Sequence, residues 1–490
     1  MISHTKSEFQ NNLKNKKKFI FYKKIKIYNL DPIPVFMNIV DKKKYSFLYE
    51  SVEKRKNKGR YSFCGSGALT IIKNKGKTLY LTDNKKTKII RKNKNILEKI
   101  NKIISEYKFI DSKNLPPMTS AFFGYLSYEN INNVENIIKN KKINDLSIPD
   151  SLLFIPETLI IFDNQKNDLF ITKTILRKSS YLDYESITSQ YEKILLTIKS
   201  KIDFDKLKIN KKVKLFPKSN MSKSKYISNV NKAKKYIKNG DIFQVVPSQR
   251  FSVKYNSTGK KLYQALRITN PSPFLYYFNL PKINIVGSSP EILVRLRKNI
   301  VTIRPIAGTR PRGKNKSIDK AYEKELLSDK KEISEHLMLL DLGRNDVGKV
   351  AEKNSVKVTA SFNVEKYSHV MHIASNVQGH LKRNKSSMDA LMAGFPAGTV
   401  TGAPKIRAME IIDELESTKR GIYAGGIGYI SPNGEMDTCI ALRTGIIYKK
   451  KLYVQAGGGV VFDSDPEMEY EESVNKAKAV FNAAEIALGN

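Results

Sequence analysis

The chain has 490 residues, and 87 lysine and arginine residues against 47 acidic ones give it a net charge of +40. Such a charge suggests a nucleic-acid or anionic-membrane partner. Apolar residues make up 40% of the chain, which excludes a largely disordered protein. Two cysteines, Cys64 and Cys439, exclude a disulfide framework and a cysteine-rich zinc site. No apolar run approaches the ~18 residues of a membrane span, and residues 1–18 lack the apolar core of a secretory signal. We therefore expect a cytoplasmic protein.

The kind of basic residue weakens the nucleic-acid interpretation. Only 16 of the 87 basic residues are arginine, whereas nucleic-acid surfaces favour arginine for bidentate contacts. The lysines are spread over loops and polar faces among many asparagines and isoleucines, the residues of A/T-rich codons. Mutational bias explains this pattern better than a binding footprint. A basic nucleic-acid-binding protein stays as an alternative, and we expect no nucleic-acid partner.

The N-terminal part contains short β-rich pieces. Residues 68–72, 78–81 and 158–162 are strand-like, and 96–107 has helical periodicity. A lysine-rich polar stretch at 201–224 resembles a linker. The sequence then becomes richer in glycine with fewer charge runs.

The C-terminal part alternates strands with helices. We expect buried strands at 283–287 and 299–304, an alternating strand at 355–360, and a helix over 332–343 that ends at a glycine. Two β-rich runs, 438–448 and 452–462, are joined by residues 449–451 as a hairpin. A final helix to residue 488 is predicted to begin at a capping box of Ser464 and Glu467, with Pro466 in its first turn. Hairpins beside helices favour an α+β fold of antiparallel sheets, packed as a β-sandwich with surrounding helices.

Two predicted helices each carry a pair of carboxylates. Glu332 and Glu335 lie three residues apart and share a helix face, as do Glu469, Glu472 and Lys476 on the final helix. Oxygen ligands of this kind suit Mg²⁺, which keeps waters and shares its shell with a substrate. The alternative is two solvated helix faces, which spacing alone favours.

Glycine-rich elements and one arginine mark candidate anion sites. The elements at 307–309, 398–402, 425–426 and 457–459 expose backbone N–H groups, but none matches a nucleotide-binding loop. Each by itself is more often a turn. Arg443 interrupts the apolar run 439–447, and an arginine within a strand is costly unless it is paired. We expect it to face a ligand carboxylate; the alternative is an edge strand with Arg443 in water.

Several strings of the sequence resemble the chorismate-utilising enzymes. They are residues 241–250 (DIFQVVPSQR), 304–313 (RPIAGTRPRG), 335–346 (EHLMLLDLGRND), 395–405 (FPAGTVTGAPK), 437–443 (DTCIALR) and 455–459 (QAGGG). The N-terminal part is similar more loosely, at 47–53 (FLYESVE) and 59–63 (GRYSF). Within this family the chain is most similar to the large synthase subunits, component I, of anthranilate synthases. The resemblance implies three regions: 1–200 regulatory and sheet-completing, 201–224 the polar linker, and 225–490 chorismate-binding and catalytic.

Two positions separate the activities of the family. Aminodeoxychorismate synthases commonly carry a nucleophilic lysine where this chain has Ala307, which cannot attack a substrate. Isochorismate and salicylate synthases carry a lysine base where this chain has Gln244, an amide without a basic lone pair. The resemblance therefore implies that ammonia is the nucleophile. An aminodeoxychorismate synthase component I of the folate pathway that acts without the lysine remains the alternative enzyme.

The resemblance also implies a mechanism and its residues. Chorismate and ammonia would give aminodeoxyisochorismate, and elimination would give anthranilate and pyruvate, in the first step of tryptophan biosynthesis. Glu335 and Glu472 would bind Mg²⁺ directly, and Glu332 and Glu469 through water. The substrate would be held by Gly308, Thr309, Tyr423, Arg443, Gly457, Gly458, Gly459 and Lys476. His372 would assist elimination, Thr399 and Glu291 would position departing groups or relay protons, and His369 would be structural.

Regulation and a partner follow from the same resemblance. Family members bind tryptophan as an inhibitor between two strings that here are residues 48–51 and 270–275. Ser51, Pro273, Phe274 and Leu275 would contact this effector. The chain ends at Asn490, without room for a glutaminase domain. We therefore expect a separate glutamine amidotransferase subunit that delivers ammonia, and hence a hetero-oligomer.

Overall fold

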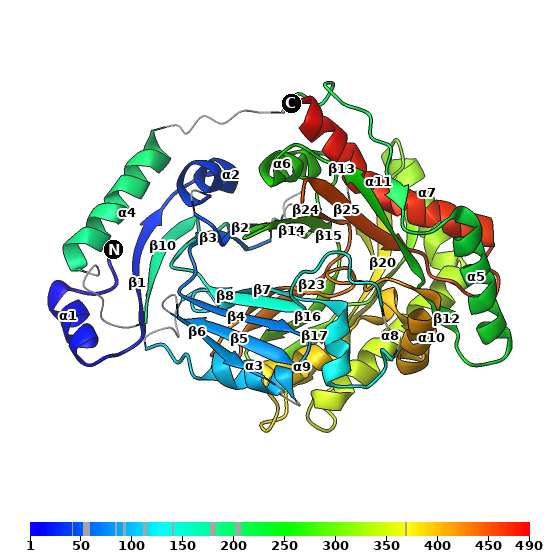
Figure 1. Ribbon diagram of the computed structural model, residues 1–490, viewed down its shortest axis with the longest axis horizontal. Coiled ribbons are helices and arrows are strands. Elements are labelled where there is room, and N and C mark those ends of the chain that lie inside the picture. Colours follow the sequence, from blue (N-terminus) through cyan, green and yellow to red (C-terminus); the bar gives the residue numbers. More distant parts are fainter. Residues whose placement is uncertain are drawn as a thin grey trace.

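The computed structural model describes residues 1–41, 43–51, 59–83, 86–91, 95–110, 115–139, 142–176, 183–200, 207–367 and 370–490. These residues form two large sheets that lie face to face, with helices on their outer faces (Figure 1). Every pairing between the strands of these two sheets is antiparallel. The predicted α+β fold is confirmed.

The strands of each sheet come from both halves of the sequence. The first sheet runs in the order β1 (Phe19–Lys26), β10 (Asp168–Ile175), β9 (Thr158–Asp163), β3 (Tyr61–Ser66), β2 (Ser46–Glu50), β14 (Phe274–Leu280), β15 (Ile283–Ser289), β24 (Thr444–Tyr448), β25 (Lys451–Gly457), β13 (Ser248–Lys254) and β11 (Lys218–Ser219). The second runs in the order β18 (Ile306–Pro311), β20 (Val370–His380), β17 (Ile300–Ile303), β16 (Ile292–Arg297), β23 (Met436–Ile440), β22 (Gly426–Ile430), β7 (Phe122–Leu126), β8 (Ser151–Ile155), β4 (Thr70–Lys75), β5 (Thr78–Asp83) and β6 (Lys86–Ile90), with β19 (Lys357–Lys366) beside β20. A short third pairing joins β12 (Gln244–Val245) to β21 (Gly402–Ala403).

The helices cover the sheets from outside. They are α1 (Lys6–Lys14), α2 (Pro32–Val35), α3 (Ile96–Ser105), α4 (Tyr184–Lys199), α5 (Lys223–Lys238), α6 (Gly259–Thr269), α7 (Lys316–Ser328), α8 (Lys330–Val350), α9 (Ser387–Gly394), α10 (Lys405–Leu415) and α11 (Pro466–Gly489). Shorter helical turns are η1 (Phe36–Val40), η2 (Tyr128–Asn133) and η3 (Gly398–Val400). No helix in the described ranges has the length and apolarity needed to cross a membrane.

The core lies in layers on both sides of each sheet. Along β2, Phe47 and Tyr49 enter the aromatic cluster between the sheets, while Leu48 enters the cluster under α6 and α11. This follows from the alternation of side chains along a strand, and both faces are apolar because both are covered. Phe47 stacks on Phe123 of the opposite sheet with ring centroids 4.4 Å apart. The central aromatic layer thus fixes the two sheets against each other.

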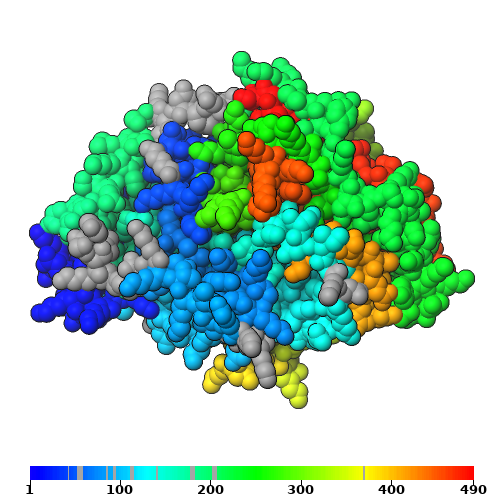
Figure 2. Space-filling view, in the orientation of Figure 1, coloured from blue at the N-terminus to red at the C-terminus, as the bar shows by residue number. Residues whose placement is uncertain are grey.

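The two halves of the chain share the fold. β2 pairs with β14 in the first sheet, and β7 pairs with β22 in the second. On the surface, cyan segments of the N-terminal half lie against orange segments near residue 415 (Figure 2), where the Lys139 amide donates to Asp413 Oδ2 at 3.0 Å. Residues 1–200 therefore complete both sheets. The division into regulatory, linker and catalytic regions stays a prediction; residues 207–217 are irregular, and 201–206 lie outside the described residues.

Most predicted elements are present, with different ends. The strands near 68–72, 78–81, 158–162, 283–287, 299–304 and 355–360 are β4, β5, β9, β15, β17 and β19, and the helix near 96–107 is α3. The hairpin of β24 and β25 is confirmed, and its turn residues Lys449 and Lys450 have φ of 48° and 58°, as a tight two-residue turn requires.

Two predicted helix boundaries are wrong. α8 continues past Gly343 to Val350 because its apolar face packs on β18 and β20, and this packing outweighs the glycine. The final helix is capped by Asp465, whose Oδ1 accepts from the Met468 amide at 2.9 Å, and not by a box of Ser464 and Glu467. Ser464 instead donates to Glu469 Oε1 at 2.6 Å. Pro466 is in the first turn, as predicted.

Candidate active site

A cavity of about 420 Å³ lies where α8, α11, β18 and the end of β25 meet. The residues predicted for catalysis, substrate and metal line it together, although they come from distant parts of the chain. Those lining it are Glu291, Gly308, Thr309, Glu332, Glu335, His372, Thr399, Tyr423, Arg443, Gly457, Gly459, Glu469, Glu472 and Lys476. Gly458 is not among the lining residues, and a Cβ added there would meet Glu469 Oε2 at 2.5 Å and Glu472 Oε2 at 3.2 Å. A side chain at 458 would therefore collide with the carboxylates.

The carboxylates of α8 and α11 converge in this cavity. Burial, and then the neighbouring Glu472, raises the pKa of Glu469 to about 7. Burial raises the pKa of Glu335 as well, with Glu332 and Glu472 adding to the rise. Among the described residues, Glu469 Oε2 is buried without a hydrogen-bond partner. Carboxylates that disfavour one another's charge form a site that a cation would stabilise.

The geometry limits how a metal ion could bind there. Within the described ranges, no three acidic, histidine or cysteine side chains are arranged to enclose a metal ion. Mg²⁺ commonly takes only one or two carboxylates and completes its shell with water and substrate, so the donor set fits this ion. Arg310 Nη1 donates to Glu332 Oε1 at 2.9 Å, and Lys476 Nζ lies 2.8 Å from Glu472 Oε1. Glu332, predicted to act through water, and Glu472, predicted to bind the ion directly, thus both already have positive partners.

His372 is held as a neutral base. Its Nδ1 lies 2.8 Å from the Gly308 carbonyl oxygen and 3.1 Å from Thr309 Oγ1. Since a carbonyl only accepts, Nδ1 carries the proton and Nε2 keeps a lone pair. Burial lowers the pKa of His372 to about 4, so the ring is neutral at pH 7. His369, predicted to be structural, lies outside the described residues.

Glu291 is a carboxylic acid at neutral pH. Burial raises the pKa of Glu291 to about 8, and Thr399 Oγ1 donates to its Oε1 at 3.1 Å. A protonated carboxyl and a neutral imidazole in one cavity form a candidate acid and base pair, because their surroundings push their pKa values apart. Tyr423, also in the wall, is kept protonated because burial raises its pKa to about 12.

Arg443 lies between two strands and not within one. β23 ends at Ile440 and β24 begins at Thr444, because Arg443 has φ of +46°, a left-handed conformation that breaks the strand. Its guanidinium lines the cavity, and no carboxylate of the described chain lies within ion-pair distance of it. Burial lowers the pKa of Arg443. A strained arginine without a counter-charge suits an anionic ligand.

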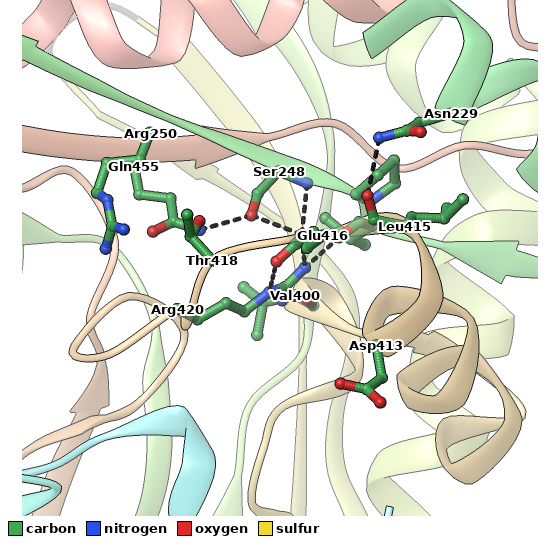
Figure 3. A network of polar contacts seen from close by, with 12 residues as sticks. Asn229, Ser248, Arg250, Val400, Asp413, Leu415, Glu416, Thr418, Arg420 and Gln455 are labelled. Atoms are coloured by element: carbon green, nitrogen blue, oxygen red, sulfur yellow. Dashed lines mark hydrogen bonds and ion pairs between the residues drawn. The ribbon is translucent and has the colours of Figure 1, made fainter. Parts of the chain in front are cut away.

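A buried ion pair between Arg420 and Glu416 lies beside the cavity, and Figure 3 shows the network of polar contacts around it. Arg420 Nε and Nη2 donate to the Glu416 carboxylate at 2.9 and 2.7 Å, and the Ser248 amide and hydroxyl donate to it at 2.8 Å each. The other arginine nitrogen donates to the Val400 carbonyl at 2.8 Å. Gln455 Nε2 extends the network to Ser248 Oγ at 2.8 Å. Val400 and Gln455 line the cavity, so this network fixes two of its walls.

Replacing Arg420 by methionine should lower the free energy of unfolding by about 3–5 kcal/mol, because it leaves the Glu416 charge buried without its partner. The two side chains are 1% and 4% exposed. Urea denaturation followed by circular dichroism measures the loss. The matched control is Arg344→Met, which removes an exposed pair with Asp341 and should cost no more than about 1 kcal/mol. Equal losses in both variants would contradict the structural role of Arg420.

Two glutamines of the site were given no binding role in the prediction, although Gln244 was named as a position that separates the activities of the family. Gln244 Nε2 donates to Glu335 Oε1 at 2.9 Å, and Gln455 belongs to the network under the cavity. The Oε1 atoms of both are buried without a hydrogen-bond partner in the described part of the chain. The sequence signal that could have identified them is a glutamine beside apolar residues, which are Val245–Val246 for Gln244 and Tyr453–Ala456 for Gln455.

A second cavity of about 470 Å³ contains most of the predicted effector residues. Ser51, Pro273 and Phe274 line it with Tyr49 and Glu50. Four arginines, Arg60, Arg295, Arg297 and Arg304, also line it, and each forms an ion pair with a carboxylate of the chain. Leu275 does not line this cavity. It is fully buried on the other face of the sheet, under α6, because it alternates with Phe274 along β14.

Comparison with known proteins places the chain in a family. A family model described as chorismate binding enzyme matches residues 45–482. Anthranilate synthase component 1 of Cereibacter sphaeroides is 43% identical over 468 residues, 93% of this chain and 92% of that protein. The protein of the same description from Acetivibrio thermocellus is 43% identical over 463 residues, 93% of each. The crystal structure of anthranilate synthase component I from Streptococcus pneumoniae TIGR4 is similar with a TM-score of 0.77 and 36% identity, covering 93% of this chain and 98% of that one. The chain belongs to the family of chorismate binding enzymes.

Proposed function

We propose that this chain is an anthranilate synthase component I, a lyase that converts chorismate and ammonia to anthranilate and pyruvate. The observation that carries the proposal is one cavity in which four kinds of group meet: a carboxylate cluster, an arginine without a carboxylate partner among the described residues, a neutral histidine and a protonated carboxyl. Relatives described as anthranilate synthase component 1, 43% identical over 93% of the chain, support the same activity.

The nucleophile comes from outside the chain. Gln244 and Ala307 line the cavity at the two positions where other members of the family carry lysines. Neither side chain can attack the ring or activate water. Ammonia from a separate glutamine amidotransferase subunit fills this role. The complex of the two subunits works in the cytoplasm, and tryptophan biosynthesis consumes its product.

The residues divide the work of the reaction. Glu335 and Glu472 would hold Mg²⁺, with Glu332 and Glu469 acting through water, and a bound ion would supply positive charge for the ring carboxylate and the departing hydroxyl. Arg443, Tyr423, Lys476 and the amides of Gly457–Gly459 hold the substrate carboxylates, beside Gly308 and Thr309.

Proton transfer uses the acid and the base of the cavity. Glu291, aligned by Thr399, gives a proton to the leaving hydroxyl as ammonia adds. His372 Nε2 takes the ring proton as pyruvate leaves, since its Nδ1 proton is fixed on Gly308. Ammonia addition followed by elimination gives anthranilate, with aminodeoxyisochorismate as the intermediate.

Product identification tests this function. The purified chain is incubated with chorismate, Mg²⁺ and ammonium at about pH 8, where part of the ammonium is free ammonia and part of Glu291 is still protonated, and the product is separated and measured by its fluorescence. Anthranilate with equimolar pyruvate is expected. A 4-amino product would indicate aminodeoxychorismate synthase and overturn the proposal. Glutamine in place of ammonium should give no product until the amidotransferase subunit is added.

The second cavity is the proposed site of feedback inhibition by tryptophan. Its volume and its aromatic wall of Tyr49, Phe63 and Phe274 suit an aromatic amino acid, whose carboxylate would share one of the arginines with that arginine's present acidic partner. Ser51→Phe should raise the inhibition constant of tryptophan about tenfold or more, because the larger side chain takes space in the cavity. Initial rates at several tryptophan concentrations measure this. The KM for chorismate should stay within about twofold, and retention of full inhibition would place the effector elsewhere.

A further inference from the structure

The two cavities share a wall. Pro290 lines both of them, while its neighbours Glu291 and Ile292 line the first and the second, respectively. A second connection comes from the segment 270–274, whose last two residues, Pro273 and Phe274, line the second cavity. The first residue of this segment, Asn270, contacts a residue of the first cavity. The segment therefore touches both sites.

The orientation of Arg443 depends on this segment. Asn270 Oδ1 accepts a hydrogen bond from Arg443 Nη1 at 3.4 Å. Within the described residues, this is the hydrogen bond that the side chain of Arg443 makes. The backbone of Arg443 is held from the same side, since its carbonyl accepts from the Ser288 amide at 3.3 Å, and Ser288 Oγ donates to the Asn270 carbonyl. A neutral amide orients the guanidinium without cancelling its charge. A substrate carboxylate can thus still bind it.

Asn270 is anchored at one end of a stiff segment. It caps the C-terminus of α6, where its amide donates to the Leu266 carbonyl at 2.8 Å. Two of the next three residues, Pro271 and Pro273, have a fixed φ, so the segment has few ways to absorb a displacement. The Asn270 Nδ2 atom is buried without a hydrogen-bond partner in the described chain, so the amide can turn without breaking another bond. A shift of Pro273 or Phe274 would therefore reach Oδ1.

We propose that Asn270 is a positioning residue that orients Arg443 for the substrate carboxylate and couples occupancy of the second cavity to the first through the contact of Asn270 Oδ1 with Arg443. This inference rests on the proposed function and specifies its regulation. A ligand against Pro273 and Phe274 moves the acceptor away from Arg443, and chorismate then binds more weakly. By linkage, bound chorismate weakens the ligand of the second cavity by the same factor.

The test is Asn270→Ala in the purified chain, with chorismate, Mg²⁺ and ammonium as substrates and tryptophan as the probe of the second cavity. The KM for chorismate should rise about fivefold while kcat changes less than about twofold, because a hydrogen bond that orients a binding group is lost. Saturating tryptophan raises this KM by a factor that we call the tryptophan factor. In Asn270→Ala the tryptophan factor should be at least about threefold smaller than in the wild type. Tryptophan binding itself, followed by calorimetry without chorismate, should persist.

Two controls separate positioning from general damage. Ser272→Ala, in the same segment but without contact to Arg443, should leave both the KM and the tryptophan factor as in the wild type. In an Arg443→Lys background, Asn270→Ala should have little further effect, because the residue through which it acts is already changed. An unchanged tryptophan factor in Asn270→Ala, or a full Asn270→Ala effect in the Arg443→Lys background, would overturn the inference.

The wild-type protein separates this inference from the proposed function. Wild-type protein that makes anthranilate but does not bind tryptophan would overturn the coupling alone. Wild-type protein that makes no anthranilate would overturn the proposed function.

Discussion

Glu335→Gln should lower kcat/KM for chorismate by about 100-fold or more and raise the Mg²⁺ concentration needed for half-maximal rate. Glu335 lies on α8 with its carboxylate in the cavity, where Gln244 Nε2 orients Oε1 at 2.9 Å. Glutamine keeps the shape but removes the charge that a cation needs. Initial rates over a range of Mg²⁺ concentrations measure the effect, and calorimetry of Mg²⁺ binding without substrate gives a second readout.

The control for this prediction lies on the other helix. Glu472→Gln should behave as Glu335→Gln does, whereas Glu471→Gln, one residue away but outside the cavity lining, should leave rate and Mg²⁺ requirement near the wild-type values. A Glu335→Gln enzyme with an unchanged Mg²⁺ requirement would remove Glu335 from the metal shell. The comparison of Glu471 with Glu472 separates a local role from the loss of one negative charge on α11.

Glu291→Gln should lower kcat by about 100-fold or more, and the wild-type rate should fall above about pH 8. Burial raises the pKa of Glu291 to about 8, so its carboxyl is protonated below that pH and loses its donor proton above it. The pH profile must be measured at a constant concentration of free ammonia, because ammonia itself becomes more available as pH rises. In the Glu291→Gln variant this alkaline decline should be absent.

Thr399→Val tests the assignment of the alkaline decline in rate to Glu291, because this variant should shift the pH at which the rate falls. The Thr399 hydroxyl donates to Glu291 Oε1, and this bond lowers the pKa of Glu291 by favouring its charged form. Without the bond the pKa rises, so the alkaline decline should shift to higher pH. A decline that stays at the wild-type pH in Thr399→Val, or persists in Glu291→Gln, would assign it to another group.

These expectations share one physical basis. The cavity keeps a carboxyl protonated and an imidazole neutral because burial disfavours the charged form of both. It also keeps Arg443 charged without a carboxylate partner in the described chain. Acid, base and anion site are thus ready before the substrate arrives, which is the arrangement that lowers the cost of reorganisation during a reaction.

Local pattern in the sequence determined much of this protein. Alternation and turn residues predicted β4, β5, β9 and the hairpin of β24 and β25, since these features depend on neighbouring residues. Carboxylates spaced three apart correctly placed Glu332 with Glu335, and Glu469 with Glu472, on shared helix faces that line one cavity. The family strings contain many of the residues of that cavity, Glu335, Thr399 and Arg443 among them.

The tertiary structure decided what depends on distant contacts. Because α8 packs on the second sheet, the helix continues past Gly343. The left-handed backbone at Arg443 interrupts the strand that the apolar residues around it predict. The Ser464 hydroxyl donates to Glu469 and does not cap α11. Because side chains alternate along β14, Leu275 lies on the face of the sheet opposite to the second cavity. The meeting of α8 with α11, and of Asn270 with Arg443, joins residues more than 100 positions apart. Sequence periodicity carries no information on such distances, because side chains far apart in the chain meet only when both sheets have closed on their common core.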